Sequence, residues 1–307
     1  MLLTVLALVG AANAPAPTLA VASNPSHQPI VEGVRWPDVS LPVVVDLSGI
    51  SADWQALARA ALATWNGAGA QFWYVEPDDA STGANAVRLE EIEQIMLCGA
   101  EFQPAACTFP FIYQFAPQHM SSVRIQLNRP LLRGERPRRP PVVVDVAALL
   151  THELGHAAGL GEATNRSAAM YTAALWTVLS EDDVRELRTL YGTADGPRPQ
   201  RAPTLWQPAD GSAAPLNLTL RWEPVPAAFG YYVQVETAAV YDSRGGFVDV
   251  GFGEYVADVA TEGPEHRLAR PLVDGTQYYW RVKARTPGGN SPWSTPAHFV
   301  ASAAASP

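Results

Sequence analysis

The stretch His152-Glu153-Leu154-Gly155-His156-Ala157-Ala158-Gly159-Leu160-Gly161-Glu162 decides the fold of the region around it. Its two histidines stand four residues apart in a segment rich in helix formers, and Asp145 upstream is a suitable helix N-cap. Because residues i and i+4 share one face of a helix, both imidazoles project from the same side. Gly159 can take a positive φ and turn the chain sharply, which would bring Glu162 back beneath the two rings.

This arrangement contains the ligand types of a zinc site. Two imidazole nitrogens one helical turn apart can bind a single zinc ion, and a carboxylate is a legitimate third ligand that leaves one position open for water. Glu153 can accept a proton from such a water, whose pKa zinc lowers toward ~7. The sequence therefore predicts His152, His156 and Glu162 as ligands of one Zn²⁺ ion and Glu153 as the catalytic base.

Segments on both sides of this stretch extend the pattern. Arg35-Trp36-Pro37 lies upstream, and Ser167-Ala168-Ala169-Met170-Tyr171 and Leu179-Ser180-Glu181-Asp182-Asp183 lie downstream. Together with the zinc motif, these segments resemble the matrixin-like peptidases of the metzincin group. The resemblance covers about residues 28–192.

The resemblance implies a fold and an activity. It implies an α+β domain with a twisted mixed sheet over helices, and a substrate cleft along an edge strand, here Ser122–Leu127. It places Met170 in the Met-turn that lies beneath the metal. It also implies a zinc endopeptidase that hydrolyses peptide bonds in protein or peptide substrates.

The chain departs from this family in two places, and alternatives stay open. The family's third ligand is His or, in some branches, Asp, whereas this chain has Glu162, and Thr172 stands where Pro is usual. The third ligand could instead be a Glu of the later helix, Glu181 or Glu186. The domain could also be a non-catalytic relic in an extracellular binding protein, although an intact base speaks against that. For Tyr171 we hypothesise that its hydroxyl approaches the cleft.

Local patterns predict the other elements of the first region. Alternating and β-branched runs indicate strands, while apolar residues at helical spacing, caps and terminal glycines indicate helices. The expected strands are Leu41–Asp46 and Ser122–Leu127, and the expected helices are Ser51–Trp65, Asp145–Gly159 and Ser180–Gly192, the last opened by a capping box.

The region 203–302 reads differently, as an all-β sandwich. Its alternating segments are Leu216–Trp222, Tyr231–Val235 and Tyr278–Ala284, separated by Gly, Pro and Asp turns. The run Leu272–Val282, with Trp222 before it and Gly288–Ser294 after it, resembles a fibronectin type III domain of the immunoglobulin-like class. The resemblance implies that Tyr278 is the corner tyrosine and that Trp222 and Val282 are core residues. An open alternative is that this domain does the main work by binding a protein or polymer surface.

The ends and joints of these regions have their own signals. Residues 1–22 read as a signal peptide, with a short apolar run and the small residues Ala20-Val21-Ala22 before the cleavage point. We therefore expect a secreted protein. Residues 193–202 are polar and Pro-rich, as is typical of a linker. No later segment has the ~18 consecutive apolar residues of a membrane span.

Composition and cysteine count limit the remaining possibilities. The net charge of −9 argues against a nucleic-acid partner, because such proteins normally present a basic face. In an exported protein the two cysteines, Cys98 and Cys107, are expected to form one disulfide. No contiguous calcium-loop motif is visible, so bound Ca²⁺ stays open.

Overall fold

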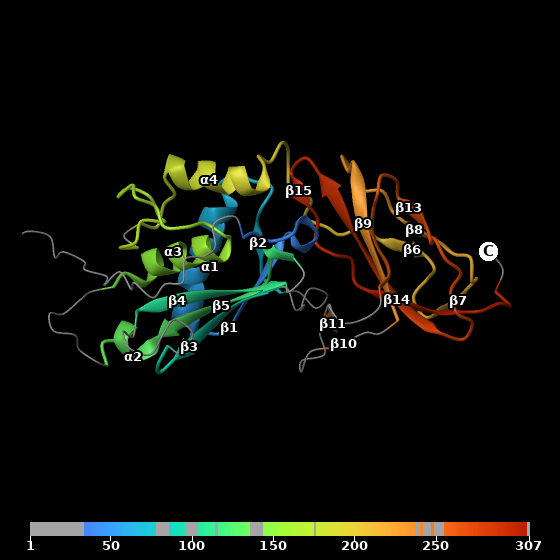
Figure 1. The fold of residues 1–307 in the computed structure, drawn as a ribbon, viewed down its shortest axis with the longest axis horizontal. Helices are drawn as coiled ribbons and strands as arrows, with labels where there is room; N and C mark the ends of the chain where they lie inside the picture. The colour runs from blue at the N-terminus through green and yellow to red at the C-terminus, as the bar shows by residue number, and fades with distance from the viewer. Residues whose placement is uncertain are drawn as a thin grey trace, which may run out of the picture.

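The computed structural model describes residues 34–77, 86–95, 104–113, 116–135, 144–174, 176–237, 240–241, 247–248 and 255–305. Its elements form two groups that lie side by side along the long axis of the molecule (Figure 1). Each group has its own hydrophobic core, one built from residues of 34–191 and the other from residues of 214–301. The predicted signal peptide, residues 1–22, lies outside the described residues.

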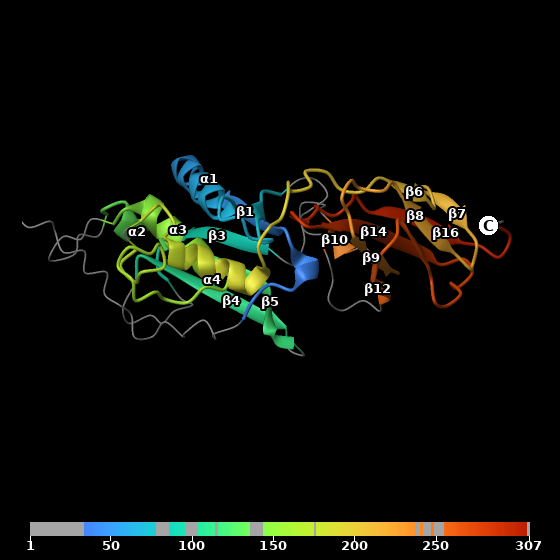
Figure 2. The ribbon, with the colours of Figure 1, turned by 90° about the horizontal axis from the view of Figure 1, so that it is seen from above.

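The first group is a five-stranded mixed sheet with helices. Its elements are η1 (Asp38–Ser40), β1 (Val43–Gly49), α1 (Ala52–Asn66), β2 (Tyr74–Val75), β3 (Ala86–Ile92), β4 (Ala106–Tyr113), β5 (Ala116–Asn128), α2 (Arg129–Leu132), α3 (Val146–Ala157) and α4 (Glu181–Tyr191). The strand order is β2-β1-β3-β5-β4. The pairs β1–β2, β1–β3 and β3–β5 are parallel, whereas β4 runs antiparallel to β5. Helices α1 and α3 pack against each other beside this sheet (Figure 2).

The expected position of the edge strand was wrong. Ser122–Leu127 lies within β5, and β5 is hydrogen-bonded on one side to β3 and on the other to β4. In the described part of the chain the strand at this edge of the sheet is β4, which the sequence patterns did not indicate. Pro110 explains the omission, because it interrupts the strand pattern and cannot donate to a ladder. Proline is therefore confined largely to edge strands, which is where the structure places it.

The predicted helices are confirmed, and so are the signals that begin and end them. Asp145 caps α3 by accepting hydrogen bonds from the backbone N–H groups of Ala147, at 2.9 Å, and Ala148, at 3.2 Å. Ser180 and Asp183 form the reciprocal capping box of α4. Gly192 ends that helix with a φ of 81°.

The second group is a sandwich of two β-sheets. One is six-stranded, with the order β12-β9-β14-β16-β7 and β15 paired to β14, and the other is three-stranded, with the order β13-β8-β6. A separate pair, β10 and β11, stands outside these sheets. The strands are β6 (Leu205–Gln207), β7 (Ser212–Ala214), β8 (Thr219–Trp222), β9 (Gly230–Glu236), β10 (Val240–Tyr241), β11 (Phe247–Val248), β12 (Tyr255–Thr261), β13 (Glu265–Arg267), β14 (Gln277–Thr286), β15 (Gly289–Asn290) and β16 (Ala297–Ala301).

The core and corner residues that the resemblance implied for this sandwich are confirmed. Trp222 and Val282 are buried in its core. The hydroxyl of Tyr278 accepts a hydrogen bond from the backbone N–H of Val273 at 3.0 Å. A hydrogen bond back to the chain a few residues upstream is the mark of a tyrosine corner.

Two further expectations concern disulfide bonding and membrane spans. Cys107 is fully buried in β4 next to Ile95. Cys98 lies outside the described residues, so their pairing stays a prediction. In the part of the chain that the structure describes, we find no helix with the length and apolar character that crossing a bilayer requires.

Candidate metal centre

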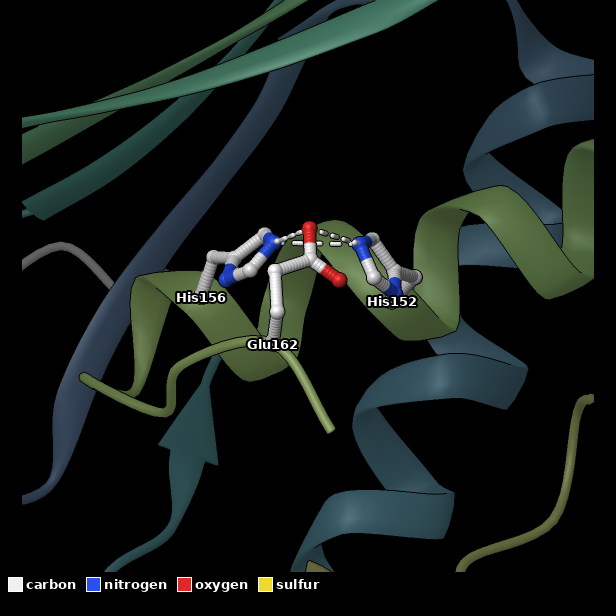
Figure 3. A group of neighbouring side chains, drawn as sticks. All are labelled: His152, His156 and Glu162. Atoms are coloured by element: carbon white, nitrogen blue, oxygen red, sulfur yellow. Dashed lines mark hydrogen bonds and ion pairs between the residues drawn. The ribbon is translucent and has the colours of Figure 1, made fainter. Parts of the chain in front are cut away.

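Helix α3 holds the two histidines on one buried face. His152 and His156 are 4% and 3% exposed, and their rings meet edge to face with centroids 4.5 Å apart. Their Nε2 atoms lie 3.0 Å from each other (Figure 3). One helical turn therefore brings both imidazoles to a single point, as the spacing predicted.

Backbone carbonyls fix the tautomer of both rings. His152 Nδ1 lies 3.0 Å from the carbonyl oxygen of Ala169, and His156 Nδ1 lies 2.9 Å from that of Leu160. A carbonyl oxygen only accepts hydrogen bonds, so each Nδ1 carries the hydrogen and each neutral ring turns a lone pair outward on Nε2. Two facing lone pairs repel each other unless a cation lies between them. The donor chemistry thus fits a metal ion, held by imidazoles whose second nitrogen is anchored to the protein.

Glu162 completes the group. Its Oε1 lies 3.6 Å from Nε2 of His152 and 3.5 Å from Nε2 of His156, and Figure 3 shows the carboxylate between the two rings. Gly159, with a φ of 96°, makes the turn that returns the chain, and a Cβ there would lie 2.5 Å from the carbonyl oxygen of Val34. The sequence prediction of this turn is confirmed.

No other such cluster occurs among the described residues. His152, His156 and Glu162 form the one group there whose potential ligand atoms all lie within 4.8 Å of one another. Glu181 and Glu186, the alternative third ligands, belong to no such group in that part of the chain. The structure therefore favours Glu162.

The charges of the group support one another. Burial raises the pKa of Glu162, but the neighbouring His152 and His156 side chains outweigh burial, so this pKa lies well below the usual range. Burial lowers the pKa of His152, but Glu162 and Glu153 outweigh it, so that pKa is raised. The carboxylates thus make a negative environment that stabilises a cation at the Nε2 atoms.

The fourth predicted site residue, Glu153, faces the edge strand. It is 3% exposed, and the hydroxyl of Thr108 in β4 donates to its Oε2 at 2.5 Å. The same hydroxyl lies 3.2 Å from the backbone carbonyl oxygen of Glu153. Sequence reasoning missed Thr108 because it missed β4, and no other signal in the sequence marks this residue.

Met170 lies against helix α3, in close contact with Gly155. A Cβ at Gly155 would lie 2.1 Å from the sulfur of Met170 and 2.6 Å from Cζ2 of Trp65. Met170 is fully buried, as the resemblance implied. The lack of a side chain at Gly155 is therefore what allows the methionine to reach the helix.

Asp183 anchors the turn that carries Met170, and sequence reasoning missed this contact. Its carboxylate is 1% exposed and accepts from the backbone N–H groups of Ala169, at 2.8 Å, and Met170, at 3.1 Å. It also accepts from the N–H of Ser180 at 2.7 Å and from its hydroxyl at 2.8 Å. The sequence marked Asp183 only as part of a capping box, and that local signal contained no information about the turn.

Aromatic side chains hold the C-terminal end of α3. The indole N–H of Trp36 donates to the carbonyl oxygen of Ala157 at 2.8 Å. The hydroxyl of Tyr191 donates to the carbonyl oxygen of Ala158 at 2.7 Å. It also accepts from the backbone N–H of Trp36 at 3.1 Å. These bonds satisfy carbonyl groups that a helix end leaves without intrahelical partners.

Tyr171 follows the methionine, and its backbone forms an isolated bridge with Ala163. The side chain is partly buried. The approach of its hydroxyl to the cleft stays a prediction.

Comparison with known proteins gives two kinds of match. The sequence model of the matrixin family matches residues 56–192. Similar solved structures include an Fn3-like protein from Clostridium thermocellum, with 20% identity over 33% of this chain and 93% of that one and a TM-score of 0.24. They also include the fn3 domain of the human collagen alpha-1(XX) chain, with 22% identity over 38% of this chain and 94% of that one and a TM-score of 0.24. A search of curated proteins finds no match.

The matched range contains helix α3 with His152 and His156, and also Glu162 and the turn of Met170. Residues 56–192 are therefore similar in sequence to the matrixin family.

Proposed function

We propose that this chain is a secreted zinc-dependent endopeptidase in which His152, His156 and Glu162 hold the ion and Glu153 is the general base. The observation that carries the proposal is the pair of Nε2 atoms 3.0 Å apart, each on a ring anchored through Nδ1. The carboxylate of Glu162 at 3.5 and 3.6 Å supplies the negative charge that such a cation site needs. The match of residues 56–192 to the matrixin family model supports zinc as the ion and protein or peptide as the substrate.

Glu153 performs the proton transfers in the proposed reaction. Zinc, when bound, supplies a Lewis acid that polarises the scissile carbonyl and lowers the pKa of water. The carboxylate of Glu153 takes one proton from the attacking water and gives it to the nitrogen of the leaving amine, so that the C–N bond breaks as the new C–O bond persists. Thr108 donates to one oxygen of this carboxylate and thereby orients it.

An extended peptide is the substrate shape that fits this region. β4 lies at the edge of the sheet in the described part of the chain, and its Thr108 touches Glu153. A peptide can add to a sheet edge through main-chain hydrogen bonds. Such a peptide would run past the general base.

The decisive experiment is cleavage of a denatured protein by the purified chain, with and without a zinc chelator, beside Glu153→Ala. We expect the chelator to abolish cleavage, and Glu153→Ala to retain zinc while turnover falls by about 10²–10⁴-fold. Asp182→Asn, in a surface ion pair of α4, is the matched control and should cleave normally. Full activity of Glu153→Ala would exclude this mechanism. A folded, zinc-loaded wild type that cleaves nothing would support the non-catalytic binding protein instead.

The ligand set needs its own measurement. We expect Glu162→Gln to lower the zinc content of the purified protein, because an amide is a poorer zinc ligand than a carboxylate. Glu186→Gln, the alternative ligand, should keep its zinc. The opposite pattern would move the third ligand to α4.

We also propose export of the protein, on the basis of the signal-peptide pattern in residues 1–22. N-terminal sequencing of the protein recovered outside the producing cell should begin at Ser23. Recovery of the protein only inside the cell, with its N-terminus intact, would contradict the proposal.

A further inference from the structure

The sandwich contacts the peptidase domain through one end of β14 and the hairpin that follows it. The side-chain nitrogen of Lys283 donates to the carbonyl oxygen of Leu41 and lies 4.6 Å from the centre of the Trp293 ring. Lys283 is only 1% exposed. The amide nitrogen of Asn290 donates to the carbonyl oxygen of Asp38 at 2.6 Å. We call Lys283, Gly288, Gly289 and Asn290 the docking face.

The stretch 193–202, predicted as a linker, lies between the two domains and is bound to both. The backbone N–H of Asp195 donates to the carbonyl oxygen of Pro287 at 2.7 Å. On the other side, Arg198 donates to the carbonyl oxygens of Ala70, at 3.2 Å, and Phe72, at 3.3 Å. Its guanidinium also lies 5.0 Å from the centre of the Trp73 ring. The stretch is therefore fixed to the sandwich through Asp195 and to the peptidase domain through Arg198.

Two glycines lie on the docking face, Gly288 where space is short and Gly289 where φ is positive. A Cβ at Gly288 would lie 2.3 Å from the carbonyl oxygen of Pro197, and one at Gly289 would lie 3.4 Å from that of Gln71. Gly289 also has a φ of 116°, which side chains rarely adopt. At Gly288 the sandwich thus packs backbone to backbone against the stretch 193–202, and at Gly289 it contacts the peptidase domain.

The segment 36–41, which the docking face contacts, is hydrogen-bonded to helix α3. Asp38 and Leu41 belong to the same short segment as Trp36, whose indole N–H donates to the carbonyl oxygen of Ala157 in the last turn of α3. Ala157 is the neighbour of His156. A shift of this segment therefore reaches the metal centre through one hydrogen bond.

We infer that the sandwich is an intramolecular support of the metal centre, whose partner on the docking face is the segment 36–41 of the same chain. A module on a free tether would keep the charged end of Lys283 in water, whereas here that end is buried and donates to the other domain. Docked, the sandwich holds the segment that braces the end of α3. This inference does not depend on the proposed peptidase activity.

The test is hydrogen exchange of the full chain, read in peptides that cover residues 34–43 and 153–160. Gly288→Ala places a methyl group against Pro197, while a Cβ at Gly263, in another turn of the sandwich, would meet nothing within 4 Å, so Gly263→Ala is the matched control. We expect both peptides to exchange roughly tenfold faster in Gly288→Ala, as if one charge-assisted hydrogen bond were lost. Gly263→Ala should exchange like the wild type.

Lys283→Met provides an independent variant, because it removes the donor to Leu41 without adding bulk. It should accelerate the same two peptides while the sandwich strand β8 keeps its protection. If β8 also loses protection, that variant is unfolding the sandwich, and Gly288→Ala alone decides. Unchanged exchange of 34–43 in Gly288→Ala would overturn the docking, and acceleration of 34–43 without 153–160 would overturn the support of the metal centre.

Discussion

The hydroxyl of Thr108 lies 2.5 Å from Oε2 of Glu153 and connects the edge strand of the sheet to the proposed base of the reaction. Thr108 is 7% exposed and Glu153 is 3% exposed, so the contact is shielded from water. A hydrogen bond to a charged group in such surroundings is stronger than one in solvent. It fixes the direction of the carboxylate before any substrate binds.

We predict that Thr108→Val lowers turnover. Valine has the shape of threonine but cannot donate, so the carboxylate loses its orienting bond. Losing a hydrogen bond to a charged group should lower kcat about tenfold, with KM nearly unchanged, because the effect concerns proton transfer. Steady-state kinetics on one peptide substrate would measure both constants.

Thr108→Ser is the control for this effect, because serine keeps the hydroxyl and loses only a methyl group. Its kcat should stay close to that of the wild type, and both variants should retain zinc. An unchanged kcat in Thr108→Val would mean that Glu153 needs no positioning by β4.

We predict that Gly155→Ala destabilises the protein although alanine is the better helix former. The new methyl group would meet the sulfur of Met170 at 2.1 Å and Cζ2 of Trp65 at 2.6 Å, so the core must shift. Overpacking of this kind costs about 1–3 kcal/mol in the free energy of unfolding. Gly161→Ala is the control, because a Cβ there meets nothing within 4 Å. Equal urea midpoints for the two variants would refute the prediction.

Much of the metal centre could be predicted because its signals are local. Helix periodicity placed His152 and His156 on one face, and a glycine at the right distance predicted the return of Glu162. The cap at Asp145 fixed the start of α3. Each of these inferences needs only a few neighbouring residues and the geometry of one helix.

The contacts between distant segments could not be predicted in the same way. Thr108 reaches Glu153 only because β4 pairs with β5 at the sheet edge, and Pro110 hid that strand. The capping box of Asp183 gave no sign that its carboxylate also holds the turn of Met170. The stretch 193–202 has the composition of a linker, yet backbone and arginine contacts attach it to both domains. Such contacts depend on tertiary packing, and local sequence patterns contain no information about it.

We predict that Tyr191→Phe destabilises the end of α3. The Tyr191 hydroxyl donates to the carbonyl oxygen of Ala158 and accepts from the N–H of Trp36, at 2.7 and 3.1 Å. Phenylalanine fills the same space but leaves both groups without this partner, at a cost of about 1–3 kcal/mol for each that stays dry. Urea denaturation would measure the loss.

Tyr171→Phe is the control, because the Tyr171 side chain is only partly buried, and it should unfold at the wild-type midpoint. The turnover of the same variant tests whether the Tyr171 hydroxyl takes part in substrate cleavage.

We predict that Asp183→Asn weakens both the fold and zinc retention, whereas the adjacent Asp182→Asn affects neither. The buried carboxylate of Asp183 accepts from the N–H groups of Ala169, Met170 and Ser180 and from the hydroxyl of Ser180. An amide has one oxygen, so its NH₂ group must face at least one of these donors, which should cost about 2–4 kcal/mol in the free energy of unfolding.

Ala169 also supplies the carbonyl that anchors His152 Nδ1, so the turn and the ligand should loosen together. Asp182 lies outside the core, and its ion pair is of the surface kind that contributes little. Urea midpoints and the rate of zinc release to a chelator would measure both effects. Loss of stability with wild-type zinc release would show that Asp183 serves only as a helix cap.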